Sequence, residues 1–177
     1  MRITAGRLRH RLIDMTNLDT TRETQDKVRM AMFNMLGQFF DGGSALDLFA
    51  GSGALAIEAY SRGCDFICLN DLNPKAVEVE KKNCKNLKID NAKFYNLDYK
   101  EFVKKVDLKF DYIFLDPPYK MDNIEEILDD VKNLLTNNGL IIFEMAIESN
   151  YNIDNYEIIK NKTYGIKRVV VYRRIYV

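Results

Sequence analysis

The segment Asp116-Pro117-Pro118-Tyr119 places a carboxylate, two prolines and an aromatic ring next to one another. An apolar run over residues 112–115 precedes it and is typical of a buried strand. Because proline cannot donate a hydrogen bond to a sheet, the pair ends the strand and stiffens the corner that follows. The corner presents a carboxylate, a proline carbonyl and an aromatic ring together. The segment alone equally allows a plain strand terminator with a solvated aspartate and a packed tyrosine.

A glycine-rich loop, Ala50-Gly51-Ser52-Gly53, follows an earlier apolar run over residues 45–49. With Ala56 it matches the Gly-x-Gly-x-x-Gly/Ala pattern, in which bare backbone approaches a nucleotide and the N–H groups of a new helix point at it. Asp71 lies 18 residues beyond Gly53, close to the roughly 20 expected for an acceptor of ribose hydroxyls. A tight turn with Asp71 as a helix cap would account for the same residues.

Two features distinguish between the cofactors that such a loop can hold. Asp47 lies inside the apolar run before the loop, where a carboxylate is costly unless it is paired with a cation or hydrogen-bonded. S-adenosylmethionine carries an ammonium and a sulfonium group, whereas NAD has no cation at that position. The segment 116–119 also follows a strand, beside the crevice where open α/β sheets bind ligands. Both features favour S-adenosylmethionine.

The elements that must hold these residues alternate along the chain. The 177 residues are 47% hydrophobic, enough for one domain, 1–177, in which we expect a basic arm over 1–20 and a catalytic core over 21–177. We predict strands at 45–49, 66–69, 93–96, 112–115 and 140–143, helices at 24–36, from the loop to 59, at 74–87, from 99 and at 124–135, a turn at 138–139, and an antiparallel hairpin of strands at 156–160 and 168–176. This alternation indicates an α/β fold with a mostly parallel, doubly wound sheet.

The first 13 residues contain Arg2, Arg7, Arg9 and Arg11 and no acidic residue. Gly6 suits a turn, so the segment predicts a short β-hairpin with residues 7, 9 and 11 on one face, where guanidinium groups can grip phosphate oxygens. An edge strand protected by its charges is the alternative. Residues 1–36 carry 7 basic and 4 acidic groups and residues 155–177 carry 6 and 1, against 13 and 21 in between. Basic ends on an acidic body favour a polyanion contact through the termini.

Several protein classes are excluded by what the sequence lacks. It has no run of the roughly 20 apolar residues that a membrane span needs and no apolar signal core, so we expect a soluble, cytoplasmic protein without membrane contact. His10 is the only histidine, which argues against a histidine-bound metal and a Ser-His-Asp triad. Cys64, Cys68 and Cys84 lack a metal-type pairing, so we expect buried thiols and no metal site.

The motifs together resemble a known family. The segment Asp47-Leu-Phe-Ala-Gly-Ser-Gly-Ala54, with Asp116-Pro-Pro-Tyr119, is similar to class I S-adenosylmethionine-dependent methyltransferases that act on an exocyclic amino group of a base. Thr21 to Arg29, followed by Phe33-Asn34, resembles the N-terminal signature of the RsmD-type enzymes, which methylate a guanine N2 in small-subunit (16S) ribosomal RNA. The arginine-rich opening and Tyr164-Gly165 also fit, so the resemblance covers nearly the whole chain.

The resemblance implies a Rossmann-like class I methyltransferase fold. Such a fold has a mostly parallel seven-stranded sheet with helices on both faces, a C-terminal antiparallel hairpin and here a short basic N-terminal β-hairpin. His10 stands where the family usually has glycine. The resemblance also implies the cofactor S-adenosyl-L-methionine, a partner that is small-subunit ribosomal RNA or an assembling ribosomal particle, and action as a monomer.

Matching positions imply a role for each residue of the motifs. Asp47 and the glycine loop would hold the methionine end of the cofactor, Asp71 the ribose hydroxyls, and Asp98 the adenine amino group. The implied cofactor-binding residues are Asp47, Phe49, Ala50, Gly51, Ser52, Gly53, Asp71, Leu72 and Asp98. The implied catalytic residues are Asp116, Pro117, Pro118 and Tyr119, and those for RNA phosphates are Arg7, Arg9, Arg11, Arg22 and Arg29. Arg22 and Arg29 could instead form structural ion pairs, and Asp98 could cap the next helix.

Other functions remain open from the sequence. The same corner serves DNA amino-methyltransferases, which act on adenine N6 or cytosine N4, and protein-glutamine methyltransferases. A non-catalytic RNA-binding or assembly factor would need the basic arm but no reaction. A nicotinamide oxidoreductase would share only the glycine loop and its acidic partner.

Overall fold

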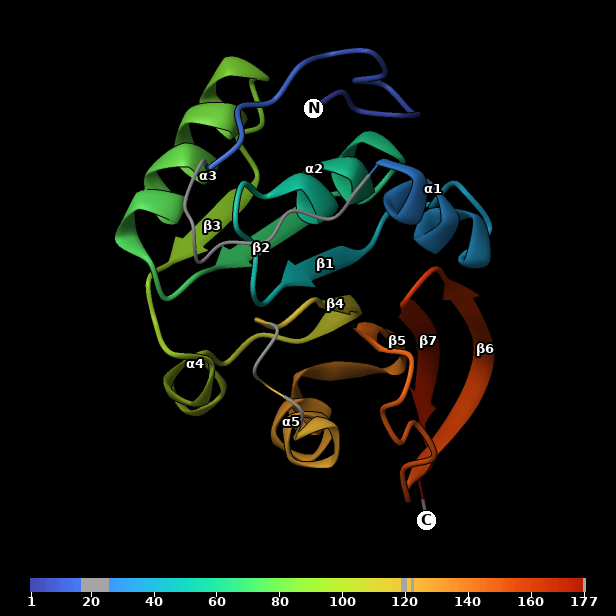
Figure 1. Ribbon diagram of the computed structural model, residues 1–177. Helices are drawn as coiled ribbons and strands as arrows, with labels where there is room; N and C mark the ends of the chain where they lie inside the picture. The colour runs from blue at the N-terminus through green and yellow to red at the C-terminus, as the bar shows by residue number, and fades with distance from the viewer. Residues whose placement is uncertain (17–25, 119–120, 122, 177) are drawn as a thin grey trace.

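The computed structural model describes residues 1–16, 26–118, 121 and 123–176. Their strands form one seven-stranded sheet in the order β3-β2-β1-β4-β5-β7-β6 (Figure 1). The strands are β1 (Ser44–Asp47), β2 (Phe66–Asn70), β3 (Ala92–Tyr95), β4 (Phe110–Leu115), β5 (Leu135–Ala146), β6 (Tyr156–Tyr164) and β7 (Lys167–Arg174). The helices are α1 (Asp26–Met35), α2 (Ala54–Ser61), α3 (Pro74–Asn86), α4 (Tyr99–Lys105) and α5 (Ile124–Val131), and a 3-10 turn, η1 (Lys132–Leu134), follows α5.

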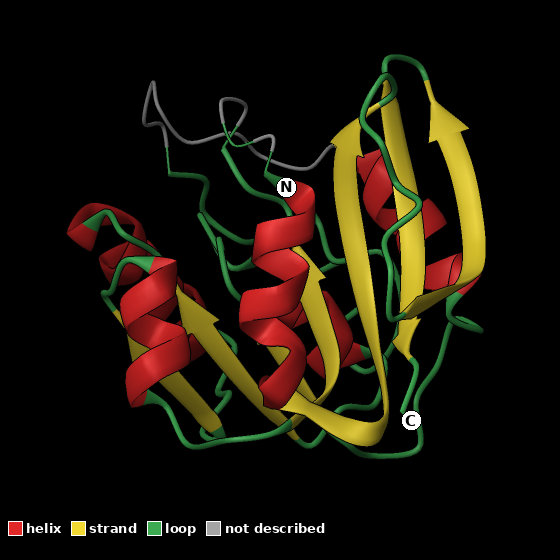
Figure 2. Cartoon of the chain, turned by 90° about the horizontal axis from the view of Figure 1, so that it is seen from below, coloured by secondary structure: helices red, strands yellow, loops and turns green. Residues whose placement is uncertain are grey.

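The direction of the strands confirms the predicted fold class. Strands β3, β2, β1, β4 and β5 are parallel to one another, whereas β7 is antiparallel to both β5 and β6. Figure 2 shows β5 and β6 running to the same edge of the sheet, with β7 running the opposite way between them. The sheet is therefore mostly parallel and ends in the expected C-terminal antiparallel hairpin.

Helices cover both faces of the sheet because successive strand residues point to opposite sides. In β1, Ala45 packs into the cluster that holds residues of α1, α2 and α3, and Leu46 packs into the cluster that holds residues of α4 and α5. Figure 1 shows the first three helices above the sheet and the other two below it. Among the described residues, no helix has both the length and the apolar character of a membrane span.

The order of the strands places a crevice at the middle of the sheet. From β1 the chain first builds outward through β2 and β3, and then returns to the other side of β1 with β4. At such a reversal the connections leave in opposite directions, which opens a ligand crevice at the carboxyl ends of the two central strands. Asp47 is the last residue of β1 and pairs with Phe114 of β4. Asp116 follows two residues after Phe114, so both aspartates lie at the carboxyl ends of neighbouring strands.

The region around the start of β5 differs from the prediction. The helix expected at 124–135 ends at Val131, and Leu135 already pairs with Phe110 as the first residue of β5. Asn138-Gly139 is not a turn but part of this strand, at an irregularity where the register with β4 shifts. A Cβ on Gly139 would lie 2.9 Å from the Phe110 carbonyl oxygen. The glycine is thus explained by close approach of two backbones, which sequence signals do not distinguish from a turn.

The N-terminal arm is only partly the predicted hairpin. Arg2 and Leu12 form a single antiparallel bridge, and the Ile3 N–H donates to the Arg11 carbonyl at 2.9 Å. Residues 5–10 between them form bends and turns, and His10 has φ 72, in the left-handed region that favours the glycine expected at this position. Because residues 7–10 are in turns, the prediction that arginines 7, 9 and 11 project in a row from one strand face is wrong.

The three cysteines are buried and free, as predicted. Burial raises the pKa of each thiol, at Cys64, Cys68 and Cys84, to about 12. At neutral pH these side chains are therefore protonated, and they behave as small apolar core residues.

Candidate active site

Three predicted acidic residues lie in series along the carboxyl edge of the sheet. Asp47 ends β1, Asp71 directly follows β2, and Asp98 follows β3 as the N-cap of α4. The three strands are parallel neighbours in the sheet, so these carboxylates face the same side of the molecule. Asp98 was predicted either to bind the adenine amino group or to cap the next helix. Its side chain accepts the Lys100 N–H at 2.9 Å as a helix cap, and it is also exposed, so the two roles are compatible.

The glycine loop is fixed by backbone conformation and by Asp71. Gly51 and Gly53 have φ 57 and φ 87, and a Cβ on Gly53 would lie 2.7 Å from Leu69 Cδ2, so that position requires glycine. The Asp71 carboxylate accepts the Gly51 N–H at 2.9 Å and the Asn73 N–H at 2.9 Å. The carboxylate implied to face a ribose therefore also holds the loop that would approach the cofactor.

Asp47 is the buried one of these three aspartates. It is 1% exposed, and its Oδ2 accepts the N–H of Ala56 in the first turn of α2 at 3.3 Å. Helix N–H groups stabilise an anion at this position. Buried beside the loop, the carboxylate has the charge and the location to attract a ligand cation.

Asparagines that the sequence analysis missed join the loops at this edge. Asn70 donates to the Leu48 carbonyl at 3.2 Å and to the Leu97 carbonyl at 2.9 Å, which ties together the ends of β1, β2 and β3. Asn83 of α3 donates to the Ser52 carbonyl at 3.0 Å. Both side chains are almost fully buried. A polar residue at a position where strand or helix periodicity requires an apolar one is the signal that could have identified them.

Glu80 is a second missed residue, beneath the same loop. It is 0% exposed, its Cγ lies 3.6 Å from where a Cβ on Gly53 would be, and neither carboxyl oxygen has a hydrogen-bond partner among the described residues. Burial, followed by the negative charges of Asp47 and Asp71, raises the pKa of Glu80 from 4.5 to about 10. At neutral pH the side chain is therefore an uncharged acid, which avoids a further negative charge beside Asp47 and Asp71.

We expect Glu80→Gln to flatten the pH dependence of stability. Above pH 4.5 Glu80 is ionised in the unfolded chain and must take up a proton on folding, because its pKa is raised in the folded chain. Its cost is therefore absent below pH 4.5 and grows as pH rises toward 10. Each pH unit in that window lowers the free energy of unfolding by about 1.4 kcal/mol. Urea denaturation of wild type and variant at pH 6 and pH 9 measures the difference. Parallel changes in the two proteins would show that Glu80 is already ionised.

The Asp116 corner lies beside this cluster, at the end of β4. Asp116 is half-buried, Pro117 is buried and Pro118 is exposed. Behind the prolines, a small hollow of about 50 Å³ is lined mainly by apolar side chains of α5 and β5 and also by Glu144 and Lys167. The Pro118 carbonyl accepts the Met121 N–H at 2.9 Å. Tyr119 of the predicted catalytic set lies outside the described residues.

The remaining cofactor-binding predictions fall around the same crevice. Phe49 packs against Tyr99 with ring centroids 5.6 Å apart, which places an aromatic wall between the loop and α4. Ala50 and Ser52 are buried within the loop, whereas Leu72 is 68% exposed beside Asp71. An exposed apolar side chain next to a ribose-binding position could cover a flat ring.

The predicted phosphate-binding arginines of the arm are exposed and differ in their contacts. The Arg7 guanidinium stacks 3.8 Å from the centre of the Tyr60 ring and donates to the Cys64 carbonyl, and Arg11 donates to the Asn86 carbonyl. Arg9 is exposed and makes no side-chain hydrogen bond or ion pair with a described residue. Arg22 lies outside the described residues.

Arg29 requires a correction. It is 1% exposed, and its Nε lies 3.2 Å from Glu58 Oε1, so its guanidinium does not reach a phosphate at the surface. The alternative prediction, a structural ion pair, is the one that the structure shows. The periodicity of a helix predicts which face Arg29 lies on, but not that its ion-pair partner is Glu58, 29 positions later in the chain.

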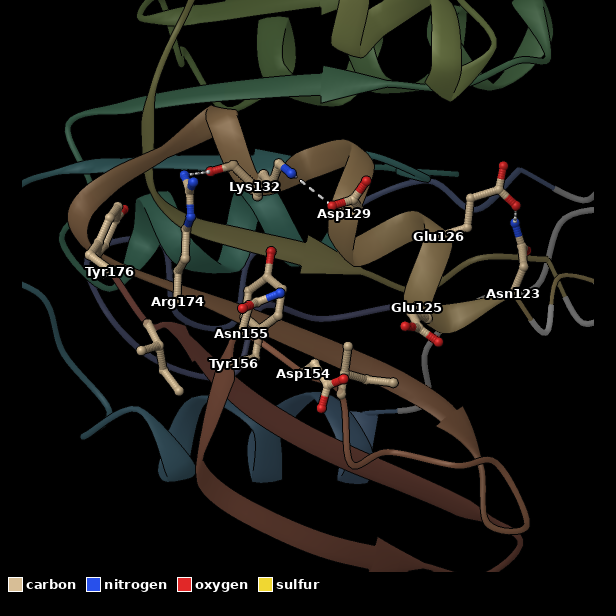
Figure 3. A pocket seen from close by; sticks show the side chains of 12 residues that line it. Asn123, Glu125, Glu126, Asp129, Lys132, Asp154, Asn155, Tyr156, Arg174 and Tyr176 are labelled. Carbon is tan, nitrogen blue, oxygen red and sulfur yellow. Dashed lines mark hydrogen bonds and ion pairs between the residues drawn. The ribbon is translucent and has the colours of Figure 1, made fainter.

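A hollow of about 770 Å³ lies away from the carboxyl edge, between α5 and the C-terminal strand (Figure 3). Four carboxylates line it, at Glu125, Glu126, Asp129 and Asp154. Its cations are engaged, because Lys132 pairs with Asp129 at 2.8 Å and Arg174 donates to the Lys132 carbonyl at 3.1 Å. Its charge disfavours a polyanion, so we assign it no part in the candidate site.

The three carboxylates of the crevice fit one kind of cofactor. A buried carboxylate at Asp47 suits a cation, Asp71 at the end of the second strand suits vicinal hydroxyls, and Asp98 at the end of the third suits an amino group. S-adenosylmethionine carries these groups in this order. A dinucleotide such as NAD would instead place its pyrophosphate at this loop, beside the buried Asp47 carboxylate.

Comparisons with known proteins agree with this assignment. The model of the family described as "Conserved hypothetical protein 95" matches residues 1–173. The chain is 36% identical to the "Putative rRNA methyltransferase YlbH" of Bacillus subtilis, over 98% of this chain and 99% of that protein. It is 32% identical to the "Ribosomal RNA small subunit methyltransferase D" of Escherichia coli, over 88% and 76%. The structure of the "Putative methyltransferase yhhF from Escherichia coli" aligns with a TM-score of 0.86 and 29% identity, over 99% of this chain and 98% of that one.

Proposed function

This chain belongs to the RsmD-type family of class I S-adenosylmethionine-dependent methyltransferases, and we propose that it methylates the exocyclic N2 amino group of a guanine in small-subunit ribosomal RNA. One observation carries the proposal: the Asp116-Pro117 corner ends the strand that pairs with the Asp47 strand. Groups that can accept hydrogen bonds from an amine would therefore lie beside the cofactor. Relatives that are named as small-subunit ribosomal RNA methyltransferases support the choice of RNA.

Residues of the crevice would hold and orient the cofactor. Bound there, S-adenosylmethionine supplies a methyl group attached to a positively charged sulfur. Asp47 would balance the positive charge of the methionine end, Asp71 would accept the ribose hydroxyls, and Asp98 would accept the adenine amino group. Because Asp71 also holds the Gly51 N–H, the same carboxylate would couple ribose binding to the shape of the loop.

The Asp116 corner would prepare the amine for attack. A guanine N2 is a poor nucleophile because its lone pair is delocalised into the ring. If the Asp116 carboxylate and the Pro117 carbonyl accept its two N–H groups, the lone pair is directed at the methyl carbon. The nitrogen would then form its bond to the methyl carbon as the carbon–sulfur bond breaks with its electrons passing to sulfur, and Asp116 or water would take the extra proton. The rate gain comes from positioning and electrostatics.

The remaining predicted residues would bind the RNA. Tyr119 would stack on a base that is turned out of its helix or loop, at a cost of a few kcal/mol. Arg9 is the arm residue most available to a phosphate, with Arg7, Arg11 and Arg22 as further candidates. The proposal includes a division into arm (1–20) and core (21–177), action as a monomer in the cytoplasm, and naked RNA or an assembling ribosomal particle as the substrate.

Transfer of tritiated methyl groups from S-adenosylmethionine tests the substrate class. We expect label in small-subunit ribosomal RNA or its particle and not in duplex DNA or in protein. Label in DNA would indicate an amino-methyltransferase of another base, and label in protein would indicate a glutamine methyltransferase. Binding of RNA without transfer to any of the three would indicate an assembly factor.

A further inference from the structure

A groove of about 680 Å³ runs between α1 and the edge strand β6. Its polar rim carries three lysines and an asparagine, and its floor consists of apolar and aromatic side chains. We call it the basic groove, and its residues are Lys27, Met30, Ala31, Asn34, Met35, Lys160, Lys162 and Tyr164. None of these residues is acidic, in contrast to the hollow of Figure 3.

The pairing of β6 with β7 determines the direction of the β6 side chains. Lys160 and Lys162 lie opposite Val171 and Val169, which pack into the core cluster on the α1 side of the sheet. Directly opposed residues in an antiparallel pair point to the same face. Lys160, Lys162 and Tyr164, spaced by two, therefore share the face that α1 covers, and Figure 1 shows α1 beside this edge.

The basic groove opens at the same edge of the sheet as the Asp116 corner. β6 and β5 are both antiparallel to β7, so β6 ends, at Tyr164, on the side where the central strands end. Lys167 pairs with Tyr164, and it also lines the small hollow behind Pro117 and Pro118. A path across adjoining residues thus leads from the corner to the groove.

We propose that the basic groove binds the sugar–phosphate backbone of the RNA substrate next to the methylated nucleotide; this rests on the proposed function. Lys27, Lys160 and Lys162 are exposed and form no ion pair with a described carboxylate. By contrast Arg7 and Arg11 donate to carbonyls and Arg29 is buried. Lysines that are not neutralised by acids are free to replace the counterions of phosphates, which is the main source of affinity for nucleic acids.

Besides its positive charge, the basic groove has aromatic and apolar side chains that suit RNA. Tyr164 is half-buried with Lys162 Nζ 5.5 Å from its ring centre, and Met30 is 45% exposed on the opposite wall. An aromatic ring and a flexible thioether offer contact to ribose and to an unstacked base without reading sequence. The groove would thus hold the strand while the corner selects the base.

The double variant Lys160→Gln/Lys162→Gln tests the proposal. We measure its affinity for a small-subunit RNA fragment as a function of salt, together with S-adenosylmethionine binding and the unfolding temperature as checks of folding. Removing two phosphate contacts should lower the slope of log K against log salt by about 1.5. If the two proteins bind equally at about 1 M salt, this difference in slope weakens binding of the variant at 0.15 M by roughly 15- to 20-fold. The matched control is Lys85→Gln/Lys104→Gln, on the helices flanking β3 at the opposite edge of the sheet.

Three results would contradict the groove proposal or the proposed function, and they show which of the two has failed. Equal slopes for the Lys160/Lys162 variant and the wild type would remove the basic groove from RNA binding and leave the proposed function intact. A loss seen with the ribosomal particle but not with the protein-free RNA would assign the groove to a ribosomal protein. A wild type that neither binds nor methylates RNA would contradict the proposed function itself.

Discussion

Asp116→Ala is expected to lower methyl transfer to RNA by about 10³-fold, with the affinity for S-adenosylmethionine changed less than twofold. The proposed role of the carboxylate is to accept an N–H of the target amine and direct its lone pair, and loss of one such preorganised group costs about 10²–10³ in rate. The cofactor affinity should persist because Asp47, Asp71 and the glycine loop are on other strands and loops. Single-turnover transfer and calorimetric titration give the two quantities.

Two further variants show which property of Asp116 matters. Asp116→Asn keeps one acceptor oxygen and removes the charge, so partial activity would indicate that the side chain orients the amine, and activity as low as that of the alanine variant would indicate that the charge or proton transfer is required. Asp107→Ala is the matched control, since Asp107 is an exposed aspartate on the connection leading into β4. Full activity of Asp116→Ala would contradict the mechanism.

Glu58→Ala is expected to lower the free energy of unfolding by about 3–5 kcal/mol and the melting temperature by roughly 10 °C. Glu58 of α2 is 1% exposed and pairs with Arg29 at 3.2 Å and with Arg62 at 3.1 Å. It also accepts the backbone N–H groups of Thr4 and Ala5 at 3.0 Å and 3.2 Å. The variant would leave the buried Arg62 guanidinium without its carboxylate partner and the buried Arg29 guanidinium with only the exposed Asp26, at 3.1 Å, and it would release the N-terminal arm from α2.

The control for Glu58 separates loss of charge balance from loss of packing. Glu101→Ala removes an exposed pair with Lys105, which should leave the urea midpoint nearly unchanged. A triple variant, Glu58→Leu/Arg29→Met/Arg62→Met, removes the whole ionic group and should be more stable than Glu58→Ala, because no buried charge remains. If Glu58→Ala unfolds like the wild type in urea, the buried ion pairs do not hold the arm.

Local signals in the sequence predicted much of the fold. Alternation of apolar runs, Asn73-Pro74 at a helix start and the glycine loop each depend on neighbouring residues, and the strands and helices they predict are confirmed within a few positions. The start of β5 was not predictable in this way. Leu135 pairs with Phe110, 25 residues earlier, and only that pairing distinguishes a strand residue from a final helix residue.

The same distinction between local signals and long-range contacts applies to the candidate site. Gly51, Gly53 and Asp71 were predicted from their spacing within one strand–helix–strand unit, and Asp47 from its position inside an apolar run. Glu80 and Asn83 were missed because their importance depends on the loop they contact, around 30 residues earlier in the chain. Arg29 was misassigned for the same reason, since its partner Glu58 lies on a different helix.

The central claim, methylation of a guanine N2 in small-subunit RNA, is tested most directly by identifying the methylated nucleoside. Small-subunit RNA from cells that lack the protein is incubated with it and S-adenosylmethionine, digested, and analysed by mass spectrometry, and the modified position is mapped by primer extension. We expect N2-methylguanosine at one position that is unmodified before incubation, formed by the wild type and not by Asp116→Ala. A methylated adenine or cytosine, or RNA from the deficient cells that already carries the full modification, would contradict the claim.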